Sequence, residues 1–178
     1  SIITSAALVG VLSATSDLRV NLVNAGSIAH QRGIKILEGK NSEGTEQYVN
    51  LVSVKIATSS SESFLGGTSI NSRVHLLRLN DFYLDMEPSA PYMVFTSHTD
   101  QPGMIGKVGM IAGEYDANIS FMEVGREAPR GEATMIVGFD DPVTEQMVSA
   151  ISSVAGVSSV KLVQQPSLEP TQPRLRET

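Results

Sequence analysis

Residues 92–163 alternate between strand and helix patterns in an order that few folds can satisfy. Short runs rich in β-branched and aromatic residues occupy 92–96, 118–126, 133–139 and 157–163, which is typical of strands. Between them lie two segments with apolar residues at helical spacing, 103–115 and 140–156. The predicted order is therefore βαββαβ, the order of a ferredoxin-like fold.

The two predicted helices differ in their ends and faces. Asp141 and Pro142 suit an N-cap followed by the first helical position, and Gly156 suits the end of the same helix. The buried stripe of this helix is predicted to be Val143, Met147, Ile151 and Val154. In the first helix the apolar stripe is Met104, Val108, Ile111, Ala112 and Tyr115, and glycines at 106, 109 and 113 fall on another face. Such a face lets a neighbouring backbone approach closely.

The N-terminal part reads as a smaller α/β domain. Helices are predicted at 5–12 and before Gly33, a strand at 48–58, and a hairpin whose strands meet at Asn80-Asp81. We expect an α+β protein: residues 1–87 form an N-terminally incomplete domain with a mixed, mostly antiparallel sheet, 92–163 form the ferredoxin-like domain, and 164–178 form a flexible, proline-rich tail.

Composition excludes several classes of function. The net charge is −6 and the 13 Lys and Arg residues are scattered, which argues against nucleic-acid binding. There is no cysteine, and no apolar run approaches the roughly 20 residues that span a bilayer. The chain does not begin with Met, so we expect a fragment of a longer protein.

Catalytic motifs are also missing from the sequence. Ser97, His98 and Asp100 are neighbours, whereas a hydrolytic triad brings its members from separate places. The three histidines lack a second metal ligand at helical or hairpin spacing. Neither a dinucleotide-binding nor a phosphate-binding glycine motif occurs. We therefore expect no catalytic residue, no metal site and no cofactor in this chain.

A site for a small ligand is the better hypothesis for residues 97–119. A helix that begins near Gly103, after Pro102, leaves backbone N–H groups free to bind a carboxylate. Asp100 or His98 can bind an ammonium or hydroxyl group, and Asn118 can donate and accept. Asp100 and Asn118 equally suit a turn and a strand entry, so both interpretations stay open.

Four stretches resemble a known enzyme family. HTDQPGMIGKVGMIAGEYDANISFMEVGR (98–126) and GEATMIVGFDDPV (131–143) are similar to the ACT regulatory domain of D-3-phosphoglycerate dehydrogenase. Upstream, VNLVNAGSIAHQRGIKILEGK (20–40) and GGTSINSRVHLLRLNDFYLD (66–85) resemble the intervening, allosteric substrate-binding domain of the long form of this enzyme.

The resemblance implies a regulatory part without the catalytic and NAD-binding domains. The parent enzyme would oxidise 3-phosphoglycerate with NAD in L-serine biosynthesis, in the cytoplasm or plastid stroma. ACT domains would pair between subunits into a homo-oligomer and bind L-serine or a similar amino acid. The effector-binding residues implied are His98, Asp100, Pro102, Gly103 and Asn118.

The resemblance also implies an anion site in the intervening domain, with Asn24, Arg32 and Lys40 as candidates, although ordinary solvated surface positions are the simpler interpretation of these residues. Some family members carry Asn at the position of Asp100 and Arg at that of Gln101. Two alternatives stay open: an ACT oligomerisation module that binds no ligand, and the regulatory part of an L-serine dehydratase. Nucleic-acid and membrane partners are not expected.

Overall fold

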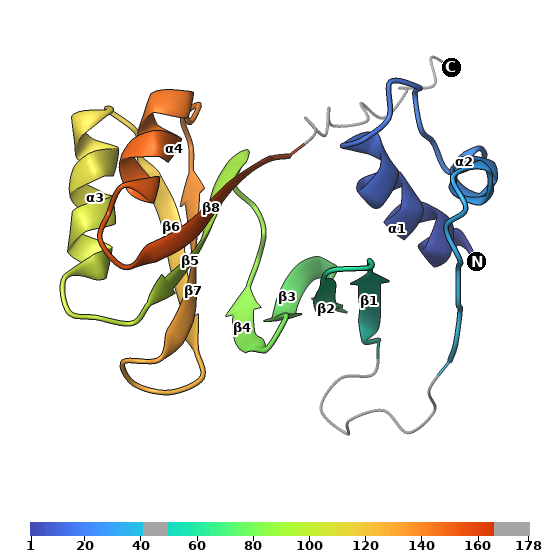
Figure 1. Cartoon of the computed structure of the whole chain (residues 1–178), viewed down its shortest axis with the longest axis horizontal. Helices are drawn as coiled ribbons and strands as arrows, with labels where there is room; N and C mark the ends of the chain where they lie inside the picture. The colour runs from blue at the N-terminus through green and yellow to red at the C-terminus, as the bar shows by residue number, and fades with distance from the viewer. Residues whose placement is uncertain (41–49, 166–178) are drawn as a thin grey trace, which may run out of the picture. The chain divides into compact units, whose positions relative to one another are not determined.

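The computed structural model describes residues 1–40 and 50–165, and these fall into two compact units that divide between residues 49 and 50. The first unit holds helices α1 (Ile2–Ser13) and α2 (Ala25–Gln31). The second holds strands β1–β8 and helices α3 and α4 (Figure 1). The expected tail falls on residues 166–178, which lie outside the described residues, as do 41–49.

The two predicted N-terminal helices are confirmed. Helix α1 begins where the Ser1 hydroxyl accepts the Thr4 N–H at 3.3 Å, and the chain after α2 turns at Gly33, which has a φ of 70°. Both helices bury apolar side chains in one cluster, made of Leu12, Ile28 and Ala29 with Leu8 and Val20 against it. Residues 34–40 have no regular secondary structure despite their β-branched content.

A four-stranded antiparallel sheet opens the second unit. Its strands lie in the order β1 (Val52–Ala57), β2 (Glu62–Ile70), β3 (Arg73–Leu79) and β4 (Phe82–Met86). The predicted hairpin at Asn80-Asp81 is confirmed. Strand β2 is not anticipated by sequence, because its register shifts at Gly66/Gly67 and so interrupts the alternation. Every described pairing in this sheet is antiparallel, so its expected mixed character is not seen.

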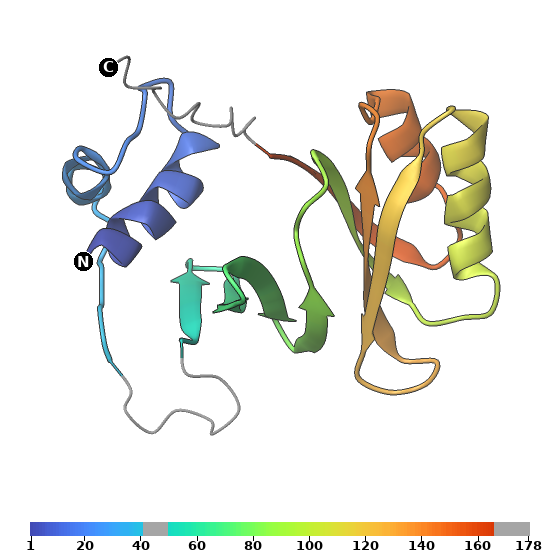
Figure 2. The same cartoon turned by 180° about the vertical axis from the view of Figure 1, so that it is seen from behind.

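The predicted βαββαβ order is confirmed. The elements are β5 (Tyr92–Thr99), α3 (Met104–Glu114), β6 (Ile119–Arg126), β7 (Glu132–Phe139), α4 (Glu145–Ser152) and β8 (Val157–Gln164). The strand order β6-β7-β5-β8, antiparallel throughout, is that of a ferredoxin-like sheet. Both helices cover one face of this sheet, as Figures 1 and 2 show.

The start of α4 differs from the prediction. The helix begins at Glu145, and the Thr144 hydroxyl caps it by accepting the Met147 N–H at 3.2 Å. Asp141 instead accepts the Asn118 N–H at 2.9 Å, which ties two loops together. The predicted stripe of α4 is confirmed, because Val143, Met147 and Ile151 are buried and Val154 packs against them.

Strand β4 packs against β6 inside the second unit. A Cβ built on Gly125 would lie 2.8 Å from the Leu84 side chain and 3.2 Å from the Tyr83 carbonyl. A shared apolar cluster includes Leu84 and Met86 of the first sheet with Met93 and Ile136 of the second. The two sheets therefore share one apolar cluster. The domain boundary predicted between residues 87 and 92 stays a prediction.

No helix in the described ranges is long and apolar enough to cross a membrane.

Candidate functional site

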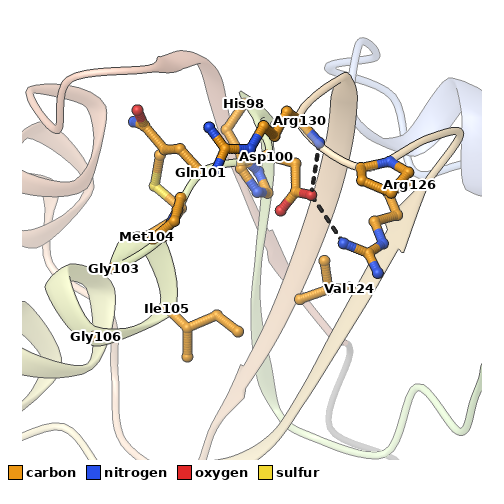
Figure 3. Close-up of a pocket in the computed structure, with 12 residues that line it drawn as sticks. His98, Asp100, Gln101, Gly103, Met104, Ile105, Gly106, Val124, Arg126 and Arg130 are labelled. Carbon is orange, nitrogen blue, oxygen red and sulfur yellow. Dashed lines mark hydrogen bonds and ion pairs between the residues drawn. The ribbon is translucent and has the colours of Figure 1, made fainter.

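A surface cavity of about 380 Å³ lies at one end of the ferredoxin-like part. The end of β5, the first turn of α3, the end of β6 and the loop before β7 surround it (Figure 3). The lining residues are His98, Asp100, Gln101, Pro102, Gly103, Met104, Ile105, Gly106, Val124, Arg126, Pro129 and Arg130. Four of the five predicted effector-binding residues thus lie around one cavity.

Asp100 is tied by three hydrogen bonds to the end of β6 and to the loop before β7. Its backbone N–H donates to the Gly131 carbonyl at 2.8 Å. Its Oδ2 accepts the Arg130 backbone N–H at 3.1 Å and Nη1 of Arg126 at 2.9 Å, as Figure 3 shows. The bond from the Arg130 backbone, with the Arg126 guanidinium next, holds the pKa of the Asp100 carboxyl below its usual value. Asp100 is therefore ionised at neutral pH.

His98 is the most deeply buried polar group of the cavity wall, with 2% of its surface exposed. Its Nδ1 lies 3.4 Å from the Thr96 hydroxyl, and the residue lines the cavity. Burial lowers the pKa of the imidazole, and the charges of Asp100 and Glu132 oppose this only in part. The ring is therefore neutral at pH 7 and can donate or accept one hydrogen bond toward the cavity.

The first turn of α3 supplies backbone donors. Gly103 takes a φ of 85° as the N-cap residue, a conformation that favours glycine. The Met104 N–H donates to the Gln101 carbonyl, but within the described part of the chain the N–H groups of Ile105 and Gly106 have no acceptor. Both residues line the cavity, so two donors and the positive end of the helix dipole are available to an anion.

Asn118, the fifth predicted effector-binding residue, does not line the cavity. Its backbone N–H donates to Asp141, and its side-chain amide donates to Oδ2 of Asp140 at 2.6 Å. It precedes β6, at the opposite end of the 11-residue helix α3, which at 1.5 Å per residue is about 16 Å long. Asn118 is therefore not part of the cavity of its own chain.

Sequence reasoning did not identify Arg126 and Arg130 as site residues. Arg126 ends the stretch 98–126 that resembles the family, but the resemblance assigns it no role. The signal that would have found both is strand register, because Thr99 pairs with Glu132 across β5 and β7. This pairing carries the loop before β7 back to Asp100, with Arg130 at a φ of 64°.

The three candidate anion-site residues lie in the first unit. Oδ1 of Asn24 accepts the Asn21 N–H at 2.7 Å, and its amide donates to the Arg19 carbonyl. At the other end of α2, Nη1 of Arg32 donates to the Thr15 hydroxyl at 3.1 Å. Lys40 is exposed. The anion site of the first unit stays a prediction.

Among the described residues, no three His, Asp or Glu side chains are grouped so that they could hold a metal ion.

Comparison with known proteins connects this geometry to one family. The family model for the D-3-phosphoglycerate dehydrogenase intervening domain matches residues 1–79. The chain is 36% identical to D-3-phosphoglycerate dehydrogenase of Synechocystis over 152 residues, 85% of this chain and 27% of the relative. It is 38% identical to that of Bacillus subtilis over 167 residues, 93% of this chain and 31% of the relative.

These matches support a regulatory region of the long-form D-3-phosphoglycerate dehydrogenase. A plant relative, D-3-phosphoglycerate dehydrogenase 2, chloroplastic, of Arabidopsis thaliana, is 34% identical over 83% of this chain and 26% of its own length. The chain spans less than a third of the length of these three relatives and corresponds to their C-terminal, regulatory part. The matches extend past residue 79 into the ferredoxin-like part that carries the cavity.

Proposed function

We propose that this chain is the amino-acid-sensing part of a D-3-phosphoglycerate dehydrogenase and that its ferredoxin-like part is an ACT domain that binds L-serine. The parent enzyme would oxidise 3-phosphoglycerate with NAD, outside this chain, and serine would be the end product that it senses. Support comes from the named relatives and from a cavity formed by four of the residues that the family resemblance implies.

The observation that carries the proposal is the pairing of charges in the cavity. An α-amino acid presents a carboxylate and an ammonium group close together. The cavity offers a guanidinium at Arg126 and a carboxylate at Asp100. It also offers the N–H groups of Ile105 and Gly106, which have no acceptor among the described residues. The neutral imidazole of His98 faces the same space and suits a hydroxyl group.

A second copy of the chain would complete the site. Asn118 lies too far from the cavity of its own chain, so we propose that Asn118 of a partner ACT domain closes the pocket of a homo-oligomer. Serine held between two copies would favour one arrangement of the interface, and its regulatory effect is limited by its difference in affinity for the two arrangements.

The competing function is an oligomerisation module without a ligand. One observation favours it: Asp100 already has a partner in Arg126, so this carboxylate does not require the ammonium group of an amino acid. A second is that a Cβ on Gly106, Gly109 or Gly113 would meet nothing within 4 Å, which leaves this face of α3 open to another backbone. An L-serine dehydratase is disfavoured, since the named relatives are dehydrogenases.

Calorimetric titration of the chain with L-serine, with glycine and D-serine as controls, tests the two functions. Selective uptake of L-serine, at most one per chain and weakened by Asn118→Ala, supports the sensor. Gln146→Ala is the matched control, because it removes an exposed carboxamide of α4 outside the cavity. A folded dimer that takes up no serine at millimolar concentration supports the module.

A further inference from the structure

The cavity carries an excess of positive charge. Its charged lining residues are Arg126, Arg130 and Asp100, and burial keeps His98 neutral. Two positive charges and one negative charge give a net +1. The N-terminal dipole of α3 adds to this potential from the opposite wall. Because the net field favours an anion, a carboxylate is attracted more strongly than an ammonium group is.

Arg126 keeps most of its hydrogen-bonding capacity. In the described part of the chain only Nη1 of its guanidinium has an acceptor, Oδ2 of Asp100. A guanidinium has five N–H donors in a planar fork that matches a carboxylate. The Arg126 side chain is 53% exposed, so it is open to an incoming ligand. Figure 3 shows it across the cavity from Ile105, with Asp100 beside it.

In contrast, Oδ2 of Asp100 is occupied, while Oδ1 has no hydrogen-bond partner in the described part of the chain. Its Oδ2 accepts two hydrogen bonds from the segment 126–130, and its backbone donates to Gly131. An ammonium group that bound this oxygen would have to displace Arg126 or share its acceptor. The geometry suits a residue that fixes the position of Arg126 and of the loop before β7.

We infer that Arg126 receives the carboxylate of the ligand, that Asp100 is a positioning residue for Arg126, and that the cavity accepts short hydroxycarboxylates without an amino group. This inference rests on the proposed function only in taking this cavity as the effector site. It extends the ligand class from amino acids to small carboxylates.

Two analogues of serine test which of its charged groups is recognised. The probe 3-hydroxypropionate is serine without its amino group, and ethanolamine is serine without its carboxylate. At pH 7.5 the full chain is expected to bind 3-hydroxypropionate with an affinity within about tenfold of that for L-serine, and ethanolamine not measurably. Binding of ethanolamine without 3-hydroxypropionate would overturn the inference.

Substitution of Arg126 tests its role directly. Arg126→Gln is expected to weaken the binding of both L-serine and 3-hydroxypropionate by about tenfold or more, the usual size of a charge-assisted bond. Arg126→Lys is expected to restore part of the lost affinity. Arg73→Gln is the matched control, because Arg73 pairs with Glu87 at 3.3 Å on β3, outside the cavity. Unchanged or tighter serine binding to Arg126→Gln would show that Arg126 only masks Asp100, and would overturn the inference.

Asp100→Asn separates positioning from direct binding. Asparagine keeps an oxygen acceptor but removes the charge that holds Arg126. As a positioning residue, Asp100 should affect serine and 3-hydroxypropionate by the same factor, whereas an ammonium-binding residue would affect serine alone. Serine binding that survives Arg126→Gln keeps the proposed function and rejects this inference. Binding of 3-hydroxypropionate without serine keeps the inference and rejects the serine sensor.

Discussion

The side-chain amide of Gln101 donates to the backbone carbonyl of Ala155 at 2.7 Å, and so connects the loop before α3 to the turn before β8. The amide lies directly over Gly156, where a Cβ would clash with Gln101 Nε2, and Gly156 has a φ of 96°. The Thr99 N–H also donates to the Gly156 carbonyl. The turn before β8 therefore holds in place the loop before α3, which lines the cavity.

Gly156→Ala is expected to lower the free energy of unfolding by about 1–2 kcal/mol, because an L side chain is strained at this φ and displaces Gln101. Chemical denaturation followed by circular dichroism measures the change. Gln101→Ala removes the clash but keeps the strain, so Gly156→Ala should be less destabilising in that background. Equal effects in both backgrounds would show that Gln101 plays no part.

Gly125→Ala is expected to destabilise the second unit by about 1–3 kcal/mol, the usual cost of overpacking. The new methyl group would lie 2.8 Å from Leu84 and 3.2 Å from the Tyr83 carbonyl, so β4 has to move away from β6. Leu84→Ala should relieve part of the strain, which denaturation of the double variant measures. A neutral Gly125→Ala would mean that the two sheets do not pack closely in solution.

Thr144→Ala is expected to cost about 1 kcal/mol of stability, as the loss of an N-cap usually does, because the Thr144 hydroxyl accepts the Met147 N–H. Thermal unfolding of Thr144→Ala and Thr144→Ser checks it, and serine should keep the cap. Asp141→Ala would instead remove the acceptor of the Asn118 N–H. If Asp141→Ala lowered the thermal stability and Thr144→Ala did not, Asp141 would be the N-cap, as the sequence predicts.

The order of elements could be predicted from sequence because it depends on local periodicity. Val108 and Ala112, like Met147 and Ile151, face one core at helical spacing, and no long-range information is needed to see this. Two details failed for local reasons. The bulge at Gly66/Gly67 hides the alternation of β2, and Asp141-Pro142 imitates a helix start that Thr144 provides.

The site was less predictable than the fold because it depends on register. Asp100 and His98 were singled out by residue type near a helix start, and both line the cavity. The partner of Asp100 is Arg126, 26 positions later, and only the pairing of β5 with β7 and of β6 with β7 brings the two together. Register is set by the whole sheet, so this contact could not be read from a local pattern.

Burial of His98 predicts a pH-dependent stability. The pKa of the buried ring lies below 6.5 in the folded protein, whereas the unfolded chain titrates near 6.5. Below about pH 6.5 the unfolded state binds more protons, so the free energy of unfolding falls as the pH drops from 7 toward the folded pKa. Above pH 7 His98 is neutral in both the folded and the unfolded state, so it no longer lowers the free energy of unfolding.

His98→Gln should therefore lose less stability between pH 7.5 and 5.5 than the unsubstituted chain does, as denaturation midpoints at the two values would show. Asp100 acts in a lower window: its pKa is depressed below 3.8, so its contribution is lost only below about pH 4. Parallel pH dependences of His98→Gln and the unsubstituted chain would contradict the assignment of His98 to the buried wall.

Gly109→Ala has two expected effects with different causes. A Cβ at Gly109 would meet nothing within 4 Å, so alanine should stabilise α3 by about 0.5–1 kcal/mol through helix propensity. If a second copy lies against this face, the added methyl group should also weaken the dimer, which analytical ultracentrifugation would detect. Gly10→Ala in α1 is the matched control, since its Cβ is equally unobstructed and should change stability without changing assembly. Stabilisation by Gly109→Ala with unaltered assembly would mean that the glycine face of α3 is not the surface through which two copies meet.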